Sequence, residues 1–192
     1  MLRTSRARRR AAAGALALAL LVHPLAAPAE PLRFRIQPEA SAISFRATSR
    51  LMTADGRFSR FSGDVMVDPA APAGARITLA IDAASIDTGI EMRDNHLRSS
   101  DFFDVERFPT VAFQSVRVES AGRRATVVGR LTVHGVTREI AVPIDVQITS
   151  TALVASGELI VNRGEYGINY NSFLNPIGNE VRVTFTFRAR VP

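Results

Sequence analysis

Apolar and polar residues alternate with a period of two through most of the chain after residue 30. The clearest run is 181–190, where apolar residues occupy every odd position and threonine or arginine every even one. Because successive side chains of a strand point to opposite faces of a sheet, this run predicts a half-buried strand. Similar alternation occurs at 77–81, 127–133, 140–148 and 153–161, and less regularly at 33–37, 42–48, 57–67 and 111–118. About nine short strands at regular spacing are typical of an all-β sandwich or barrel.

Turn-forming residues separate these runs. Asp55-Gly56, Ala121-Gly122 and His134-Gly135 each stand between strand candidates, and 68–74 is rich in proline and alanine. Such pairs predict tight turns. The alternation slips near Ser115, which indicates a bulge or a bend. Because no linker or internal repeat interrupts the pattern, residues 30–192 are expected to form one domain.

The segment 88–104 breaks the alternation and predicts a short helical region. Thr88 and Glu91 have the spacing of a capping box, in which the Thr hydroxyl accepts from the Glu amide. Ile90 and Leu97, seven residues apart, would share one helix face. After this segment, Phe108-Pro109 predicts a return to extended structure.

The first 29 residues have the pattern of a cleaved export signal. Five arginines in residues 1–10 precede an apolar run at 11–22 and the small-residue pattern Ala27-Pro28-Ala29. This order is typical of a secretory signal peptide, and the run is shorter than the ~20 residues of a membrane-spanning helix. We expect cleavage after Ala29 and a periplasmic location, with Arg9-Arg10 leaving the twin-arginine route open beside the general one.

Charge and composition exclude several classes of function. The net charge of +6 comes mainly from residues 1–10; beyond residue 29, 19 arginines face 18 acidic residues. With a near-neutral domain, two tyrosines and no tryptophan, nucleic-acid binding is not expected. The absence of cysteine excludes disulfides and thiolate metal sites. Only two histidines lie beyond residue 29, so no metal or other cofactor is expected.

A hydrolase triad is the one catalytic pattern that local sequence offers. Asp94, His96, Ser99 and Ser100 contain the required residue types. Geometry defines a triad, however, and on a helix residues 94 and 96 point about 200° apart. A polar helix face is the simpler interpretation, and we assign no catalytic residue.

Aromatic and small residues bear on the barrel interior. Ten of the eleven phenylalanines are candidates for a buried face or a cavity mouth. Simple core packing explains them equally well at this level. Because a barrel of about eight strands can be filled by side chains or can hold one small ligand, the inward positions matter. The small residues Gly129, Ala155, Gly157 and Ala189 would leave room if they point inward.

Four sequence blocks together resemble the YceI-like family of exported polyisoprenoid-binding proteins. The blocks are Gly56-Arg57-Phe58 through Asp68, Ile86-Asp87-Thr88 through Phe113, Gly129 through Arg138, and Asn162-Arg163-Gly164-Glu165-Tyr166-Gly167-Ile168 followed by Glu180-Val181. The second block, with MRDNHLRSSDFFD at its centre, is the most specific. The resemblance covers nearly all of 32–190.

The resemblance implies a single antiparallel lipocalin-like barrel of about eight strands, with a short helical segment near 88–104. It also implies an elongated apolar cavity that binds a polyisoprenoid or another long-chain lipid, without catalysis or a cofactor. A homodimer is a further expectation, and the protein partner is unknown. The expected ligand-binding residues are Phe58, Ile77, Leu79, Phe102, Phe103, Phe113, Leu131, Ile140, Val183, Phe185, Arg93 and Arg98.

Two alternatives stay open for the polar residues of the helical segment. Their hydrogen bonds and ion pairs can hold the helix over one barrel end, or Arg93 or Arg98 can contact a lipid head group, since an arginine fork suits a phosphate. Two other functions also stay open. A ligand-free structural or stress-protective module would have a cavity filled by side chains, and a lipid-modifying enzyme would depend on His96 or Asp94.

Overall fold

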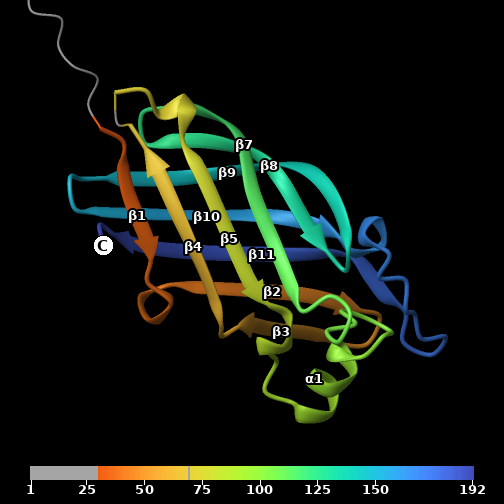
Figure 1. Ribbon diagram of the computed structural model, residues 1–192. Helices are drawn as coiled ribbons and strands as arrows, with labels where there is room; N and C mark the ends of the chain where they lie inside the picture. Colours follow the sequence, from red (N-terminus) through yellow and green to blue (C-terminus); the bar gives the residue numbers. More distant parts are fainter. Residues whose placement is uncertain (1–29, 69) are drawn as a thin grey trace, which may run out of the picture.

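The computed structural model describes residues 30–68 and 70–192 (Figure 1). The expected signal peptide and its cleavage point after Ala29 lie outside the described residues. The described chain contains one α-helix, α1 (Glu91–Arg98), and the 3-10 helices η1 (Pro38–Ala40), η2 (Pro72–Gly74), η3 (Ala83–Ser85) and η4 (Arg163–Tyr166). The strands are β1 (Leu32–Ile36), β2 (Ala42–Ser49), β3 (Thr53–Phe58), β4 (Phe61–Val67), β5 (Arg76–Asp82), β6 (Ile86–Asp87), β7 (Thr110–Ala121), β8 (Arg124–Val133), β9 (Val136–Ile148), β10 (Ala152–Asn162) and β11 (Ile177–Arg190).

These segments form a closed antiparallel barrel of eight strands, as the sequence predicts (Figure 1). The order runs β1-β4-β5-β7-β8-β9-β10-β11, and β1 pairs with both β4 and β11, which closes the ring. The remaining strands β2, β3 and β6 extend three of these eight. β2 follows β1 in the chain and pairs with β11. β3, which comes just before β4, pairs with β2. β6, which follows β5, pairs with β3. Neighbouring strands are therefore consecutive, in an up-and-down arrangement.

The three extended strands bend at neighbouring places. The bends lie at η1, at Ser59-Arg60 and at η3. Hydrogen bonds bridge the last two: the Ser59 amide donates to the Ser85 carbonyl at 3.2 Å, and the Asp82 amide donates to the Arg60 carbonyl at 3.0 Å. The sheet thus changes direction without losing its pairing, and α1 lies at the end beyond the bends (Figure 1).

Several turn predictions are confirmed. His134 and Gly135 have φ of 49° and 75° at the β8–β9 hairpin, and Gly122 has φ of 66° between β7 and β8. The slip near Ser115 is a bulge, because the register between β7 and β8 shifts between Ser115 and Arg117. There the Ser115 hydroxyl accepts from the Ile77 amide at 2.8 Å, which replaces a backbone partner.

Two local predictions are wrong. Asp55-Gly56 is not a turn but lies inside β3, and the chain reverses earlier, at 50–52. Glycine is needed at position 56 because a Cβ would lie 2.3 Å from Cζ of Phe45. The capping box is also absent: the helix begins at Glu91 with Ile90 as its N-cap, and no side chain caps it. The α-helix is therefore confined to 91–98, and turns complete the predicted segment to residue 104.

An added methyl group should be disruptive at Gly129. Its Cβ would lie 2.3 Å from Cζ of Phe113 and 2.7 Å from the Gln114 carbonyl oxygen, which is backbone. Gly129→Ala should therefore lower the free energy of unfolding by about 1–3 kcal/mol, as overpacking does. Urea denaturation measures this, with Gly74→Ala as control, since nothing lies within 4 Å of a Cβ there. Equal stability of the two variants would contradict the packing described.

No helix in the described part of the chain is long and apolar enough to cross a membrane.

Candidate ligand-binding site

The interior of the barrel contains a cavity of about 1000 Å³. Residues from all eight barrel strands line it, and most are aliphatic or aromatic, because the inward positions of the alternating strands carry the apolar side chains. The polar lining residues come from the two ends. Thr48, Ser49, Arg93 and His96 belong to the end near α1, whereas Ser120, Arg123, Gln147 and Thr149 belong to the hairpins at the opposite end. The cavity is thus an apolar passage with polar ends.

Eleven of the twelve expected ligand-binding residues line this cavity. Phe58, Phe102 and Phe103 lie toward the helical end, where Phe58 and Phe103 meet edge to face with ring centroids 5.9 Å apart. The others in the wall are Ile77, Leu79, Phe113, Leu131, Ile140, Val183, Phe185 and Arg93. Arg98 is not part of the lining.

The expectation that Gly129 and Gly157 leave room inside the barrel is wrong, because phenylalanine rings fill the space beside them. A Cβ on Gly157 would lie 2.7 Å from Cζ of Phe185, and Gly129 is covered by the Phe113 ring in the same way. At each glycine, the ring of a neighbouring phenylalanine takes the space that a Cβ would need. The cavity is therefore bounded by these rings, while Ala155 lines it directly.

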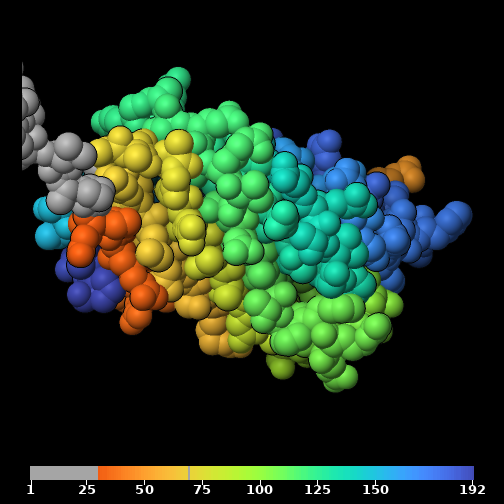
Figure 2. All heavy atoms as spheres, turned by 45° about the horizontal axis from the view of Figure 1, so that its top comes forward, coloured from red at the N-terminus to blue at the C-terminus, as the bar shows by residue number. Residues whose placement is uncertain are grey.

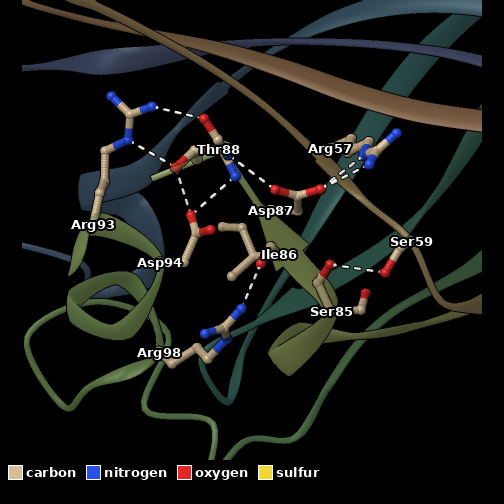
Figure 3. Close-up of polar contacts among 10 residues, drawn as sticks. Arg57, Ser59, Ser85, Ile86, Asp87, Thr88, Arg93, Asp94 and Arg98 are labelled. Carbon is tan, nitrogen blue, oxygen red and sulfur yellow. Dashed lines mark hydrogen bonds and ion pairs between the residues drawn. The ribbon is translucent and has the colours of Figure 1, made fainter. Parts of the chain in front are cut away.

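Arg98 holds the helix to the barrel. Its Nη2 donates to the Ile86 carbonyl at 2.8 Å (Figure 3). Its Nε donates to the Ala84 carbonyl at 2.9 Å, and Nη1 donates to Asn95 Oδ1. β6 ends the strand order and pairs only with β3. The guanidinium thus satisfies one carbonyl of η3 and one of β6, the strand that lacks a second neighbour. This is the structural alternative for Arg98.

Arg93 and Asp94 converge on Thr88 (Figure 3). The buried Asp94 carboxylate accepts from the Thr88 amide at 2.9 Å and from the Thr88 hydroxyl. Arg93 donates from Nε to the Thr88 hydroxyl at 2.8 Å and from Nη2 to the Thr88 carbonyl at 3.0 Å. Thr88 therefore acts as the anchor of the helix start through Asp94, not as its cap. Arg93 is the one of the two predicted arginines that reaches the cavity.

Arg163 is a buried cation that the sequence reasoning did not single out. It is 7% exposed and donates to four carbonyls: Nε to Gly178 at 3.0 Å, Nη1 to Ile168 and Tyr170 at 2.8 Å each, and Nη2 to Ile177 at 3.0 Å. Burial lowers the pKa of this guanidinium. Arg163 joins the 167–177 loop to the start of β11 and also lines the cavity. Only its place in the NRGEYG block could have indicated it.

Tyr166 lies in the same region. The residue is 2% exposed and lines the cavity. Asn162, whose Oδ1 accepts from the Gly164 amide at 3.1 Å, caps the 3-10 helix that carries Arg163 and Tyr166. Burial raises the pKa of the Tyr166 phenol above its ordinary value near 10.0, with a further contribution from Glu165. The Tyr166 phenol therefore stays neutral to a higher pH than an exposed tyrosine does.

This raised pKa makes a testable prediction at alkaline pH. The chain has no lysine or cysteine, so tyrosine dominates side-chain titration near pH 10. In Tyr170→Phe, which leaves Tyr166 alone, the phenolate absorbance should appear above pH 10 when folded and near pH ~10 in urea. The associated stability is fully present below pH ~10 and is lost as pH rises through the folded pKa. Identical titrations with and without urea would contradict the burial of this phenol.

His96 forms the only histidine–carboxylate pair in the described chain. Its Nε2 lies 3.0 Å from Asp101 Oδ2, and both side chains are about half exposed. Its ring packs edge to face on Phe102 and Tyr170, with centroids 5.0 Å and 4.8 Å away. The Ser99 hydroxyl donates to the His96 carbonyl and not to its ring. The residues of the triad pattern therefore do not form a Ser–His–Asp arrangement, because the Ser99 hydroxyl does not bond to the His96 ring and the Asp94 carboxylate bonds to Thr88.

A second hollow lies on the outer wall of the barrel, over β10, β11, β2, β3 and β6. Its charges pair with one another across strands: Arg46 with Asp55, Arg57 with Asp87, and Arg182 with Glu158. The hydrogen bond from Arg46 lowers the pKa of Asp55, and that from the Gly89 amide lowers the pKa of Asp87, with Arg57 adding to it. These pairs leave the hollow with balanced charge.

An eight-stranded antiparallel barrel around an apolar passage belongs to the lipocalin-like class of cavity barrels. Comparison with known proteins identifies the family within this class. The model of the YceI-like domain matches residues 34–189, so the chain belongs to the YceI-like family.

The relatives include UPF0312 proteins of several bacteria. A UPF0312 protein of Shewanella baltica (strain OS185) is 34% identical over 130 residues, which are 67% of this chain and 68% of that protein. A UPF0312 protein of Pseudomonas aeruginosa (strain LESB58) is 38% identical over 87 residues, which are 45% of this chain and 46% of that protein. The match to the Pseudomonas protein thus spans about half its length.

Solved structures with the same fold agree with this assignment. BcnA of Burkholderia cenocepacia superposes with a TM-score of 0.74 at 26% identity, covering 80% of this chain and 98% of BcnA. A polyisoprenoid binding domain of Saccharophagus degradans, implicated in plant cell wall breakdown, has a TM-score of 0.67 at 20% identity, covering 84% and 99%. The second likeness shows the shared fold.

Proposed function

We propose that this protein binds one long apolar lipid chain, a polyisoprenoid or similar acyl chain, inside the barrel as a non-catalytic carrier or store. The observation that carries this proposal is the apolar passage of about 1000 Å³ through the barrel. The polyisoprenoid binding domain of Saccharophagus degradans, which has the same fold, supports the class of ligand.

The physical basis is the transfer of hydrocarbon out of water. Each methylene group removed from water contributes about 0.8 kcal/mol, so ten buried carbons contribute roughly 8 kcal/mol before ordering costs. Affinity then comes mainly from the length of chain buried. Specificity comes from the width and bend of the passage, which Phe58, Phe113 and Phe185 restrict.

The polar end of the ligand is proposed to lie near α1. Arg93 and Tyr166 line the cavity at that end. Arg93 uses Nε and Nη2 on Thr88, and its Nη1 is unused by the described residues. An arginine fork and a phenol suit an oxygen-bearing head group. The arginine at position 98 is committed to carbonyls and has no part in this proposal.

A ligand-free structural module would have an interior filled by side chains, whereas the described residues leave a cavity of about 1000 Å³. The proposed site of action is the periplasm, where the protein would meet envelope lipids, and the signal-like sequence pattern of residues 1–29 supports it.

Native mass spectrometry of protein purified from the cell envelope tests the proposed function. We expect an added mass that organic extraction removes and that chromatography identifies as a long-chain lipid. The extracted protein should then bind prenyl alcohols with an affinity that rises with chain length. A bare mass, together with no heat of binding from prenyl or acyl compounds, would overturn the proposal.

A further inference from the structure

Two loops at one end of the barrel expose large apolar side chains. The β2–β3 turn presents Leu51 and Met52, 71% and 57% exposed, and the loop before β11 presents Phe173 and Leu174, 98% and 79% exposed. Isolated exposed apolar residues are ordinary, but a contiguous group indicates an interaction surface. We call residues 50–52 together with 171–176 the apolar tip.

Hydrogen bonds join the two loops into one feature. The Arg50 amide donates to the Pro176 carbonyl at 3.0 Å, and the Leu51 amide donates to Asn175 Oδ1 at 3.1 Å. Arg163 holds the base of the second loop through Tyr170 and Ile177. In the space-filling view, the second loop projects from the end of the molecule opposite the described N-terminal strand (Figure 2). The apolar side chains are therefore presented on an ordered frame.

The apolar tip is continuous with the cavity. Met52, Ser172 and Asn175 belong to both the tip and the cavity lining, and Ser49 and Ile177 line the cavity beside them. A chain that enters or leaves the barrel at this end passes next to Met52. A partner that binds the apolar tip therefore lies next to the cavity, where it can supply or receive the lipid.

The charge of the tip also differs from that of the barrel wall. Residues 167–177 contain no Asp, Glu, Lys or Arg, and residues 47–54 contain only Arg50. The outer wall, in contrast, carries paired charges along several strands. Apolar side chains with a flanking cation and no acid match the boundary between lipid head groups and acyl chains.

We propose that the apolar tip docks on a lipid bilayer, so that Phe173, Leu174 and Leu51 enter the head-group region while Arg50 meets lipid phosphates. This proposal rests on the proposed lipid-binding function and names the source or acceptor of the cargo. A protein partner would need a groove complementary to two convex loops, whereas a fluid bilayer adapts to them.

Vesicle flotation tests the docking. The protein should float with phosphatidylcholine vesicles and more strongly when phosphatidylglycerol is added. The triple variant Leu51→Ser, Phe173→Ser, Leu174→Ser should bind at least about tenfold more weakly, since it removes most of the apolar surface that the tip would bury in the bilayer. Arg50→Gln should lose only the phosphatidylglycerol-dependent part. Because these side chains are exposed, the variants should melt like the unaltered protein.

Matched controls keep the test specific. The outward-facing pair Val116→Ser, Ile160→Ser removes exposed apolar residues from the barrel wall and should leave vesicle binding unchanged. Extracted protein should bind prenyl alcohols equally well with or without the triple substitution, which separates docking from cavity binding. Equal flotation of the unaltered protein and the triple variant overturns the docking. A triple variant that changes sedimentation from dimer to monomer overturns it in favour of a second copy of this chain.

Discussion

Replacement of Val183 by tryptophan should lower the affinity for a long-chain lipid by about a hundredfold or more. Val183 lies on β11, lines the cavity, and stands between Phe45 on β2 and Leu159 on β10 in the register. An indole ring there would obstruct the passage. Each methylene group excluded forfeits about 0.8 kcal/mol, so the exclusion of four already costs about two factors of ten.

The control for this variant is the next residue of the same strand. Thr184 points to the opposite face and is exposed, so Thr184→Trp adds the same ring outside the barrel. The natural chain has no tryptophan, so each variant also carries a single fluorescent reporter of its own environment. Isothermal titration with a prenyl alcohol measures the affinity, and circular dichroism checks the fold. If Val183→Trp destabilises the barrel, Val183→Phe serves as the smaller plug. Full affinity in a folded Val183 variant would place the ligand elsewhere.

Replacement of Arg163 by methionine should lower the free energy of unfolding by about 3 kcal/mol or more. The substitution removes one donor group from four carbonyls, and each carbonyl left buried without a partner costs about 1–3 kcal/mol. Solvent reaching the loop recovers part of this cost. Arg163→Lys should give an intermediate loss, because an ammonium group lacks the planar fork that spans the four acceptors.

Arg138 provides the comparison for Arg163. It is exposed, and its Nε makes a single 3.3 Å hydrogen bond to the Glu165 carbonyl. Arg138→Met should change stability by less than about 0.5 kcal/mol, as ordinary surface substitutions do. Urea denaturation at neutral pH gives both values. Similar losses for positions 163 and 138 would show that the buried network contributes little.

Alternation of apolar residues predicted most of the strands, because a strand wall between water and an interior needs one face of each kind. Strands as long as β9 and β11 repeat this pattern many times, so the residue pattern alone was enough to predict them. The turn predicted near β3 is wrong. Asp55-Gly56 has the composition of a turn, but glycine stands there to admit the ring of Phe45 from the neighbouring strand.

The helical segment shows the same division. Its existence followed from the sequence, but its anchor did not. Thr88 and Glu91 have capping-box spacing, yet the Thr88 hydroxyl goes to Asp94, six residues along, and the helix begins uncapped. Arg93 and Arg98 looked alike on the sequence. Only the tertiary structure distinguishes them: Arg98 bonds to the carbonyls of Ala84 and Ile86 and holds the helix, whereas Arg93 lines the cavity.

By itself, the sequence determined the barrel class and the YceI-like family, the apolar and polar faces of the strands, and eleven residues of the cavity lining. These follow from residue type and spacing, which act between near neighbours. The tertiary structure alone decided the ring closure between β1 and β11, the rings that cover Gly129 and Gly157, the buried Arg163 and the apolar tip. Each of these depends on which distant segments meet, and the free energy of such contacts depends on partners that no local pattern specifies.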